Sequence, residues 1–187
     1  MRLKRVHYRR LLCGAGVLLT FLFIYWTDCC QQSTDVIVSL TTTRRRFQDE
    51  LAFTVHSLLT QRVLPKEIRI YVQTNQNLTK QKLKWFLLKQ VDSSTKINRL
   101  FDDLVQIKFE TNDYGPATKY LPILQEFHSK KSLQFQKILI LDDDHYYHPY
   151  TIATLDQYSN QYPNSILGFR GWRSRKIVFV FLSKKNE

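Results

Sequence analysis

Stretches of alternating and continuous apolar residues are separated along the chain by stretches with apolar residues at helical spacing. The first kind predicts strands at 35–40, 67–73, 104–111 and 137–141, with a fifth starting at 165. The second kind predicts helices at 47–61, 80–90, 116–131 and 149–162. Strands that alternate with helices indicate an α/β fold, with a mainly parallel sheet covered by helices on both faces.

Proline and one continuously apolar strand refine this prediction. Pro116 and Pro149 each open a predicted helix, where a missing N–H costs nothing, whereas Pro122 is expected to kink or interrupt its helix. The strand at 137–141 is a continuous apolar run, which is typical of a central parallel strand buried on both faces. We therefore expect it to be central and fully buried.

The N-terminus has a different pattern. Residues 1–10 are basic, 11–27 contain no charge, and the first acid is Asp28. We predict a cytoplasmic tail at 1–10, a transmembrane signal anchor at 11–27 and a short stem at 28–34. A cleaved signal peptide and a buried soluble helix are the alternatives. The anchor predicts a single-pass type II protein that faces the Golgi or ER lumen.

Composition narrows the class of protein only moderately. The 187 residues carry a net charge of +12, which favours anionic partners. Only three cysteines occur, all before residue 31, so no disulfide framework or cysteine metal site is expected in 31–187. Cys29 and Cys30 suit lipidation, a link between two chains, or simple thiols. Asn77 lies in a glycosylation sequon, which matters only if this part of the chain is lumenal.

Polar segments follow three of the predicted strands. They are "TTTRRR" at 41–46, "TNDYGPATK" at 111–119 and "DDD" at 142–144. In open α/β sheets the carboxyl ends of the strands form the ligand site, and a helix N-terminus there suits phosphate. Three adjacent carboxylates repel one another and need a positive partner nearby. The simplest partner is manganese or magnesium, with a nucleoside diphosphate completing its coordination.

Five ordered segments carry a family resemblance: "VIVSLTTTRRRF", "HSLLTQRVLPKEIRIYV", "NDYGPATKYLP", "KILILDDDHYYHP" and "ILGFRGW". Together, over about residues 35–172, they resemble the nucleotide-sugar-binding half of a GT-A fold glycosyltransferase of the family-two-like group. The acidic triplet resembles the DxD motif of that fold. We therefore expect residues 35–187 to form a GT-A-like domain, with the acceptor-binding half absent after the donor-binding half.

The resemblance assigns roles to particular residues. It implies donor-binding roles for Thr41, Thr42, Lys119, Asp142 and Asp143, and metal ligation by Asp142 and Asp144. The expected partner is a nucleoside diphosphate sugar, most simply a UDP-sugar. Each residue also has a structural alternative. The threonines can end a strand, Lys119 can lie on a helix surface, and the triplet can be a loop with a capping Asp.

The sequence also departs from the family pattern. Gln73, Thr74 and Asn75 follow the second strand, where many members have an acid that holds the base. No catalytic base is identifiable before Glu187. His145 and His148 admit a second metal site, although packing beneath the loop is the interpretation we adopt. The alternatives to a glycosyltransferase are an inactive nucleotide-sugar-binding domain and a metal-dependent phosphohydrolase; no nucleic-acid-binding motif is found.

Overall fold

A computed structural model describes residues 32–74, 78–129 and 137–169. Its strands are β1 (Gln32–Ser33), β2 (Val36–Thr41), β3 (Val63–Leu64), β4 (Glu67–Gln73), β5 (Val105–Glu110) and β6 (Lys137–Ile140). Its helices are α2 (Arg44–Asp49), α3 (Leu51–Leu59), α4 (Lys80–Gln90), α5 (Thr95–Leu104), the 3-10 helix η2 (Gly115–Lys119), α6 (Leu121–Ser129) and α7 (Thr151–Gln161). The α/β prediction is confirmed.

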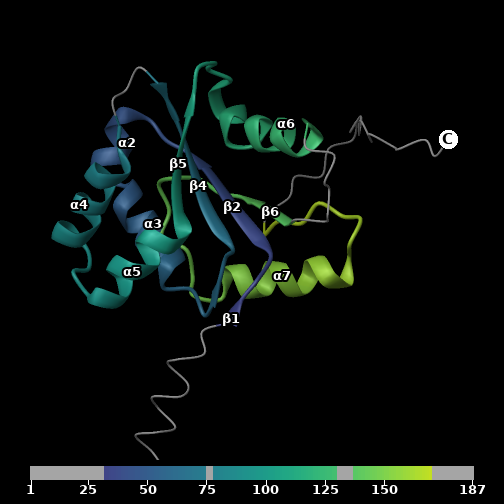
Figure 1. The fold of residues 1–187 in the computed structure, drawn as a ribbon. Coiled ribbons are helices and arrows are strands. Elements are labelled where there is room, and N and C mark those ends of the chain that lie inside the picture. Colours follow the sequence, from purple (N-terminus) through teal and green to yellow (C-terminus); the bar gives the residue numbers. More distant parts are fainter. Residues whose placement is uncertain (1–31, 75–77, 130–136, 170–187) are drawn as a thin grey trace, which may run out of the picture.

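Four of the described strands form one parallel sheet in the order β5-β4-β2-β6 (Figure 1). Strand β2 pairs with β4 on one side and with β6 on the other. The strands β5 and β6, which follow one another in the chain, are therefore the two outer strands of this sheet. A small parallel pair, β1 with β3, lies outside this sheet. Because all four strands run the same way, their carboxyl ends share one edge, and the segments after them meet there.

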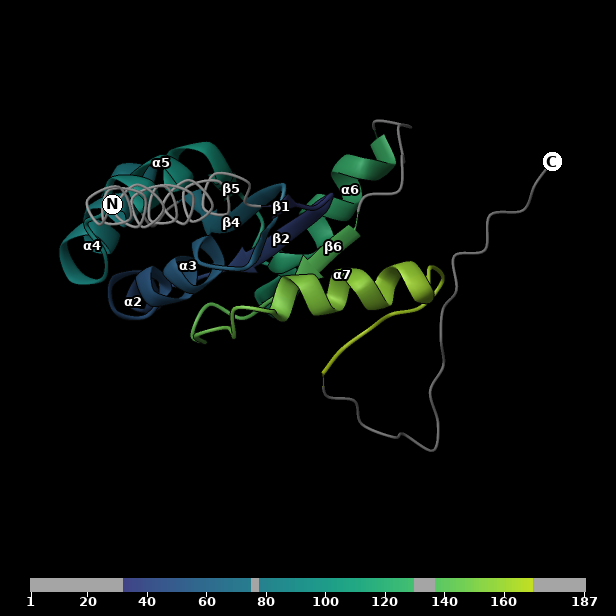
Figure 2. The ribbon, with the colours of Figure 1, turned by 90° about the horizontal axis from the view of Figure 1, so that it is seen from below.

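The two faces of the sheet bury different sets of side chains. Alternate residues of β2, among them Val38 and Leu40, belong to the larger core with α2, α3, α4, α5 and Ile152 of α7. The opposite face carries Ile37 and Tyr71, which pack with Ile123 of α6. Figure 2 shows the result, with α6 on one side of the sheet and α3 and α7 on the other. Helices therefore cover both faces, as predicted.

Capping residues and proline set the helix boundaries. Helices α2, α4 and α5 each begin with a side chain that accepts a hydrogen bond from a backbone N–H of the first turn. These capping residues are Thr43, Thr79 and Ser94. The predicted helix at 116–131 is interrupted just before Pro122, because η2 ends at Lys119 and α6 starts at Leu121. The predicted helix at 47–61 is likewise two helices, α2 and α3. Helix α5 was not predicted, although its apolar positions at 97, 100, 101 and 104 follow helical spacing.

The expectation that the strand at 137–141 is central and fully buried is wrong for the described sheet. Strand β6 pairs with β2 alone among the described strands, and residues 137–139 are only partly buried. Ile140 is 43% exposed. Central burial belongs to β2 instead, where five of six residues are buried. The predicted fifth strand does not begin by residue 169, and the rest of it lies outside the described residues.

Several sequence predictions fall outside the described residues. These are the signal anchor at 11–27 with its flanking tail, most of the stem, and the sequon residue Asn77. Within 32–74, 78–129 and 137–169, no helix has the length and apolarity needed to cross a bilayer.

Candidate functional site

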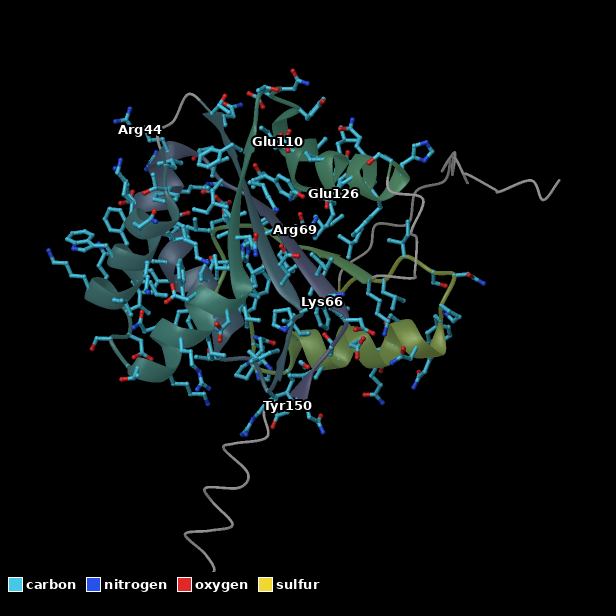
Figure 3. All side chains as sticks on the ribbon, viewed as in Figure 1. Arg44, Lys66, Arg69, Glu110, Glu126 and Tyr150 are labelled. Carbon is cyan, nitrogen blue, oxygen red and sulfur yellow. The ribbon has the colours of Figure 1, made fainter. Side chains whose placement is uncertain are left out.

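The acidic triplet follows β6 at the carboxyl edge of the sheet, as predicted. The last registered pair of β2 and β6 is Ser39 with Ile140, so Thr41 and Asp142 leave the sheet side by side. The N–H of Leu141 still donates to the carbonyl of Ser39, at 3.1 Å. In Figure 3, Arg44 and Glu110 mark this edge, and Tyr150 lies at the opposite end of the sheet.

The three carboxylates occupy different environments. Asp143 is only 2% exposed, whereas the side chain of Asp142 is 58% exposed and that of Asp144 is 28% exposed. The buried one, Asp143, has an oxygen, Oδ2, without a hydrogen-bond partner among the described residues. Asp142 and Asp144 are therefore open to a ligand, and Asp143 lies beneath them.

Arg46 joins two of these carboxylates to α2. Its Nη1 donates to Asp143 Oδ1 at 2.9 Å, and its Nη2 lies 3.4 Å from Asp144 Oδ2. The hydrogen bond to Asp143, reinforced by the charges of both aspartates, raises the pKa of Arg46. Sequence analysis noted the arginine run but did not choose among its members. The start of α2 after Thr43 decides which one turns toward the triplet.

Lys119 pairs with the remaining carboxylate, Asp142. Its Nζ lies 2.5 Å from Asp142 Oδ1, and this hydrogen bond is the main reason that the pKa of Asp142 is lowered. The Ser39 hydroxyl donates to the Lys119 carbonyl at 2.5 Å, which ties the end of η2 to β2. The structure thus brings Lys119 and Asp142 together, two residues that sequence analysis assigned to the same site.

The loop after the triplet is held against α3. The hydroxyl of Thr54 contacts the carbonyls of Asp143 and His145, each at 2.9 Å. Tyr147 Oη accepts from the backbone N–H of Asp142 at 2.9 Å and donates to its carbonyl at 3.0 Å. Burial raises the pKa of Tyr147 to about 12, so its phenol stays protonated near neutral pH. Neither Thr54 nor Tyr147 carried a sequence signal for this role.

The two threonines that were predicted to bind the donor have hydroxyl groups that donate to backbone carbonyls instead. Thr41 Oγ1 donates to the carbonyl of Tyr71 at 3.2 Å, and Thr42 is 6% exposed. Both lie at the expected edge, but no hydrogen bond joins either to the acidic triplet among the described residues. Their arrangement matches the alternative in which they end a strand.

The two histidines do not come together. His145 Nδ1 lies 2.6 Å from Asp144 Oδ1, and the His145 side chain is 63% exposed. His148 is exposed as well, so the expected packing beneath the loop is wrong for both histidines. His148 instead stacks on Tyr150, with ring centroids 5.7 Å apart. These contacts give the pair no shared ligand position.

A divalent cation fits this edge only with help from a ligand. Over the described ranges, no group of three His, Cys, Asp or Glu side chains is placed to hold a metal ion. Asp142 and Asp144 nevertheless offer accessible, hard oxygen donors. Magnesium is often held by one or two carboxylates together with substrate phosphates rather than by a cage of protein ligands. Asp142 and Asp144 fit the arrangement in which two carboxylates and substrate phosphates hold the ion together.

Comparison of the chain with known protein families, with characterised proteins and with solved structures gives no match.

Proposed function

We propose that the chain is a membrane-anchored, GT-A-like glycosyltransferase that binds a nucleoside diphosphate sugar, most simply a UDP-sugar, at the carboxyl edge of the sheet. The observation that carries the proposal is the convergence of acidic and basic side chains there. Asp142 and Asp144 come from the end of β6, Arg46 from α2 and Lys119 from η2. Such a mixed set can hold both a cation and a diphosphate.

In this proposal the residues have distinct tasks. Asp142 and Asp144 would hold manganese or magnesium, which when bound neutralises the charge of the leaving diphosphate. Arg46 and Lys119 supply cationic N–H donors for phosphate oxygens. Asp143 anchors the loop through Arg46, since it is too buried to meet a ligand in this arrangement. Thr41 and Thr42 shape the edge from β2.

A second candidate function is binding without turnover. All three carboxylates of the acidic triplet have cationic or histidine partners, and the pKa of Asp142 is lowered. A general base works best with a pKa near the operating pH. Asp142 is therefore a poor base for activating an acceptor hydroxyl. A nucleotide-sugar-binding domain without transferase activity accommodates the same geometry.

Calorimetry tests the shared part of both candidates. UDP-glucose should bind the full-length chain in the presence of manganese and lose most of its affinity when a chelator is added. Asp144→Asn removes one ligand charge and keeps the shape, so metal-dependent affinity should fall about tenfold or more. Equal affinity with and without chelator would reject the metal-bridged site. Release of free glucose or transfer to an added acceptor separates the transferase from the binding domain.

The control variant must carry the same charge change elsewhere. Asp156 of α7 is unsuitable as this control because its carboxylate pairs with Lys137 of β6 at 2.5 Å. Asp103 is exposed at the far end of α5, and its side chain has no ion pair with a described residue. Asp103→Asn should therefore leave binding unchanged.

A further inference from the structure

The cationic side chains at the carboxyl edge lie where a metal ion would have to bind. Arg46 bridges Asp143 and Asp144, and Lys119 contacts Asp142, so each carboxylate of the triplet already has a cationic neighbour. We propose that Arg46 and Lys119 act as exchangeable placeholders. Without ligand they partly neutralise the carboxylates, and with ligand they release Asp142 and Asp144 to a divalent cation and turn to the diphosphate. This inference rests on the proposed function.

The positions of Arg46 and Lys119 allow such an exchange. The Arg46 side chain is 46% exposed, and the Lys119 side chain is 21% exposed. The backbone of Lys119 is fixed to β2 through Ser39, but its four-carbon side chain can swing away from Asp142. Arg46 lies in the first turn of α2 and can keep Asp143 with one nitrogen while another turns outward.

A second observation indicates that the triplet still attracts a cation. Asp143 is 98% buried, yet only its Oδ1 is paired, and Oδ2 has no hydrogen-bond partner among the described residues. A buried, half-paired carboxylate leaves negative charge uncompensated in a region of low dielectric. The two basic side chains therefore do not fully satisfy the triplet. A doubly charged ion at the neighbouring carboxylates offsets more of this charge than either side chain alone.

Competition between like charges predicts the order of events. A metal ion that arrives alone must displace or approach Lys119 and Arg46, so its affinity is reduced. A diphosphate draws the same side chains away from the carboxylates and brings oxygens for the metal. Metal and diphosphate should consequently bind with positive coupling through these two residues. Removing either placeholder should strengthen binding of metal alone and weaken binding of diphosphate, which are effects of opposite sign.

Manganese titration of the full-length chain measures the first effect. Lys119→Gln should bind manganese alone about fivefold more tightly, which corresponds to the loss of one surface ion pair. Arg46→Gln, which removes the cation shared by Asp143 and Asp144, should gain about tenfold. Arg44→Gln is the matched control. It removes the same charge from the same helix, but Arg44 is exposed and its side chain pairs with no described residue. The control should change manganese affinity less than twofold.

Pyrophosphate in saturating manganese measures the second effect. Both variants should lose about tenfold in pyrophosphate affinity, because each loses a charge-assisted hydrogen bond to phosphate. If neither variant binds manganese more tightly than Arg44→Gln does, the exchange is rejected. Unchanged pyrophosphate affinity rejects it equally, because the side chains would then shield the carboxylates without contacting phosphate.

Two features keep the outcome independent of folding and of the donor assignment. Arg46→Gln can unfold the loop by stranding Asp143, so Lys119→Gln, whose partner Asp142 is exposed, decides the result if Arg46→Gln shows no cooperative thermal transition. Pyrophosphate carries no base or sugar. A chain that shows both effects but does not bind UDP-glucose therefore retains the exchange and loses only the proposed donor.

Discussion

Truncation of two leucines on neighbouring strands tests the observed sheet order directly. Leu40 lies in β2, between β4 and β6, and is 0% exposed. Leu139 lies in β6 and is only partly buried against the same core. The sequence alone predicts that Leu139 is central and fully buried, because its strand is a continuous apolar run. The structure instead predicts that Leu40→Ala costs more than Leu139→Ala.

The magnitudes follow from burial. Each substitution removes three carbon atoms, worth about 0.8 kcal/mol apiece when fully buried. At Leu40 the rigid surroundings on both sides add a cavity cost, so we expect a loss of about 3–5 kcal/mol in the free energy of unfolding. At Leu139 the side chain is already partly exposed and the edge can relax, so about 1–2 kcal/mol is expected. Domains of this size are marginally stable, and the larger loss is close to what such a domain can tolerate.

Urea denaturation followed by circular dichroism measures both losses, provided that the m-value stays constant. Leu124→Ala on α6 is the control, because Leu124 is 49% exposed, and it should cost less than about 0.5 kcal/mol. A Leu139→Ala cost equal to or greater than that of Leu40→Ala would refute the placement of β6 at the edge of the four described strands.

Two further predictions concern acid stability and membrane topology. The backbone N–H of Ser94 donates to Asp92 Oδ1 at 2.8 Å and is the main reason that the pKa of Asp92 is lowered, with a smaller contribution from His56. A lowered pKa in the folded state stabilises the fold above the ordinary carboxyl pKa of about 4, and this stabilisation is lost as the pH falls through the folded-state value. The melting temperature of Asp92→Asn should therefore lie below that of the wild type at neutral pH, with the gap narrowing in acid; a constant gap would contradict the assignment. If 11–27 anchors the chain with 31–187 in the lumen, glycosidase should lower the apparent mass of the wild type in microsomes but not that of Asn77→Gln, and a C-terminus open to cytosolic protease would contradict this topology.

Local signals were sufficient to predict most of the secondary structure. Apolar alternation predicted β2, β4, β5 and β6 to within a residue or so at most ends, and helical spacing predicted α4 and α7. Pro122 correctly marked an interruption of its helix. These features depend on interactions between residues a few positions apart, so the sequence expresses them directly. The helix α5 was missed although its apolar positions at 97, 100, 101 and 104 have regular helical spacing.

The carboxyl-edge site was also partly predictable. Because parallel strands end at a common edge, the sequence alone placed the acidic triplet, the threonines after β2 and Lys119 at one site. The structure joins Lys119 to Asp142. It could not be predicted that Asp143 points inward while Asp142 points outward, because adjacent residues after a strand leave the sheet in directions set by the loop. Thr54 and Tyr147 fix that loop from α3 and from within it.

The amino-acid sequence by itself determined the kinds of elements, their order along the chain and the chemistry that collects at one end of the sheet. The tertiary structure decided which strand is central and which basic side chain meets each carboxylate. Sheet order is set by crossovers between strands tens of residues apart, and their pairing depends on the total packing of both faces. The same packing orients α2 so that Arg46, and neither of the arginines before it, lies against Asp143 and Asp144.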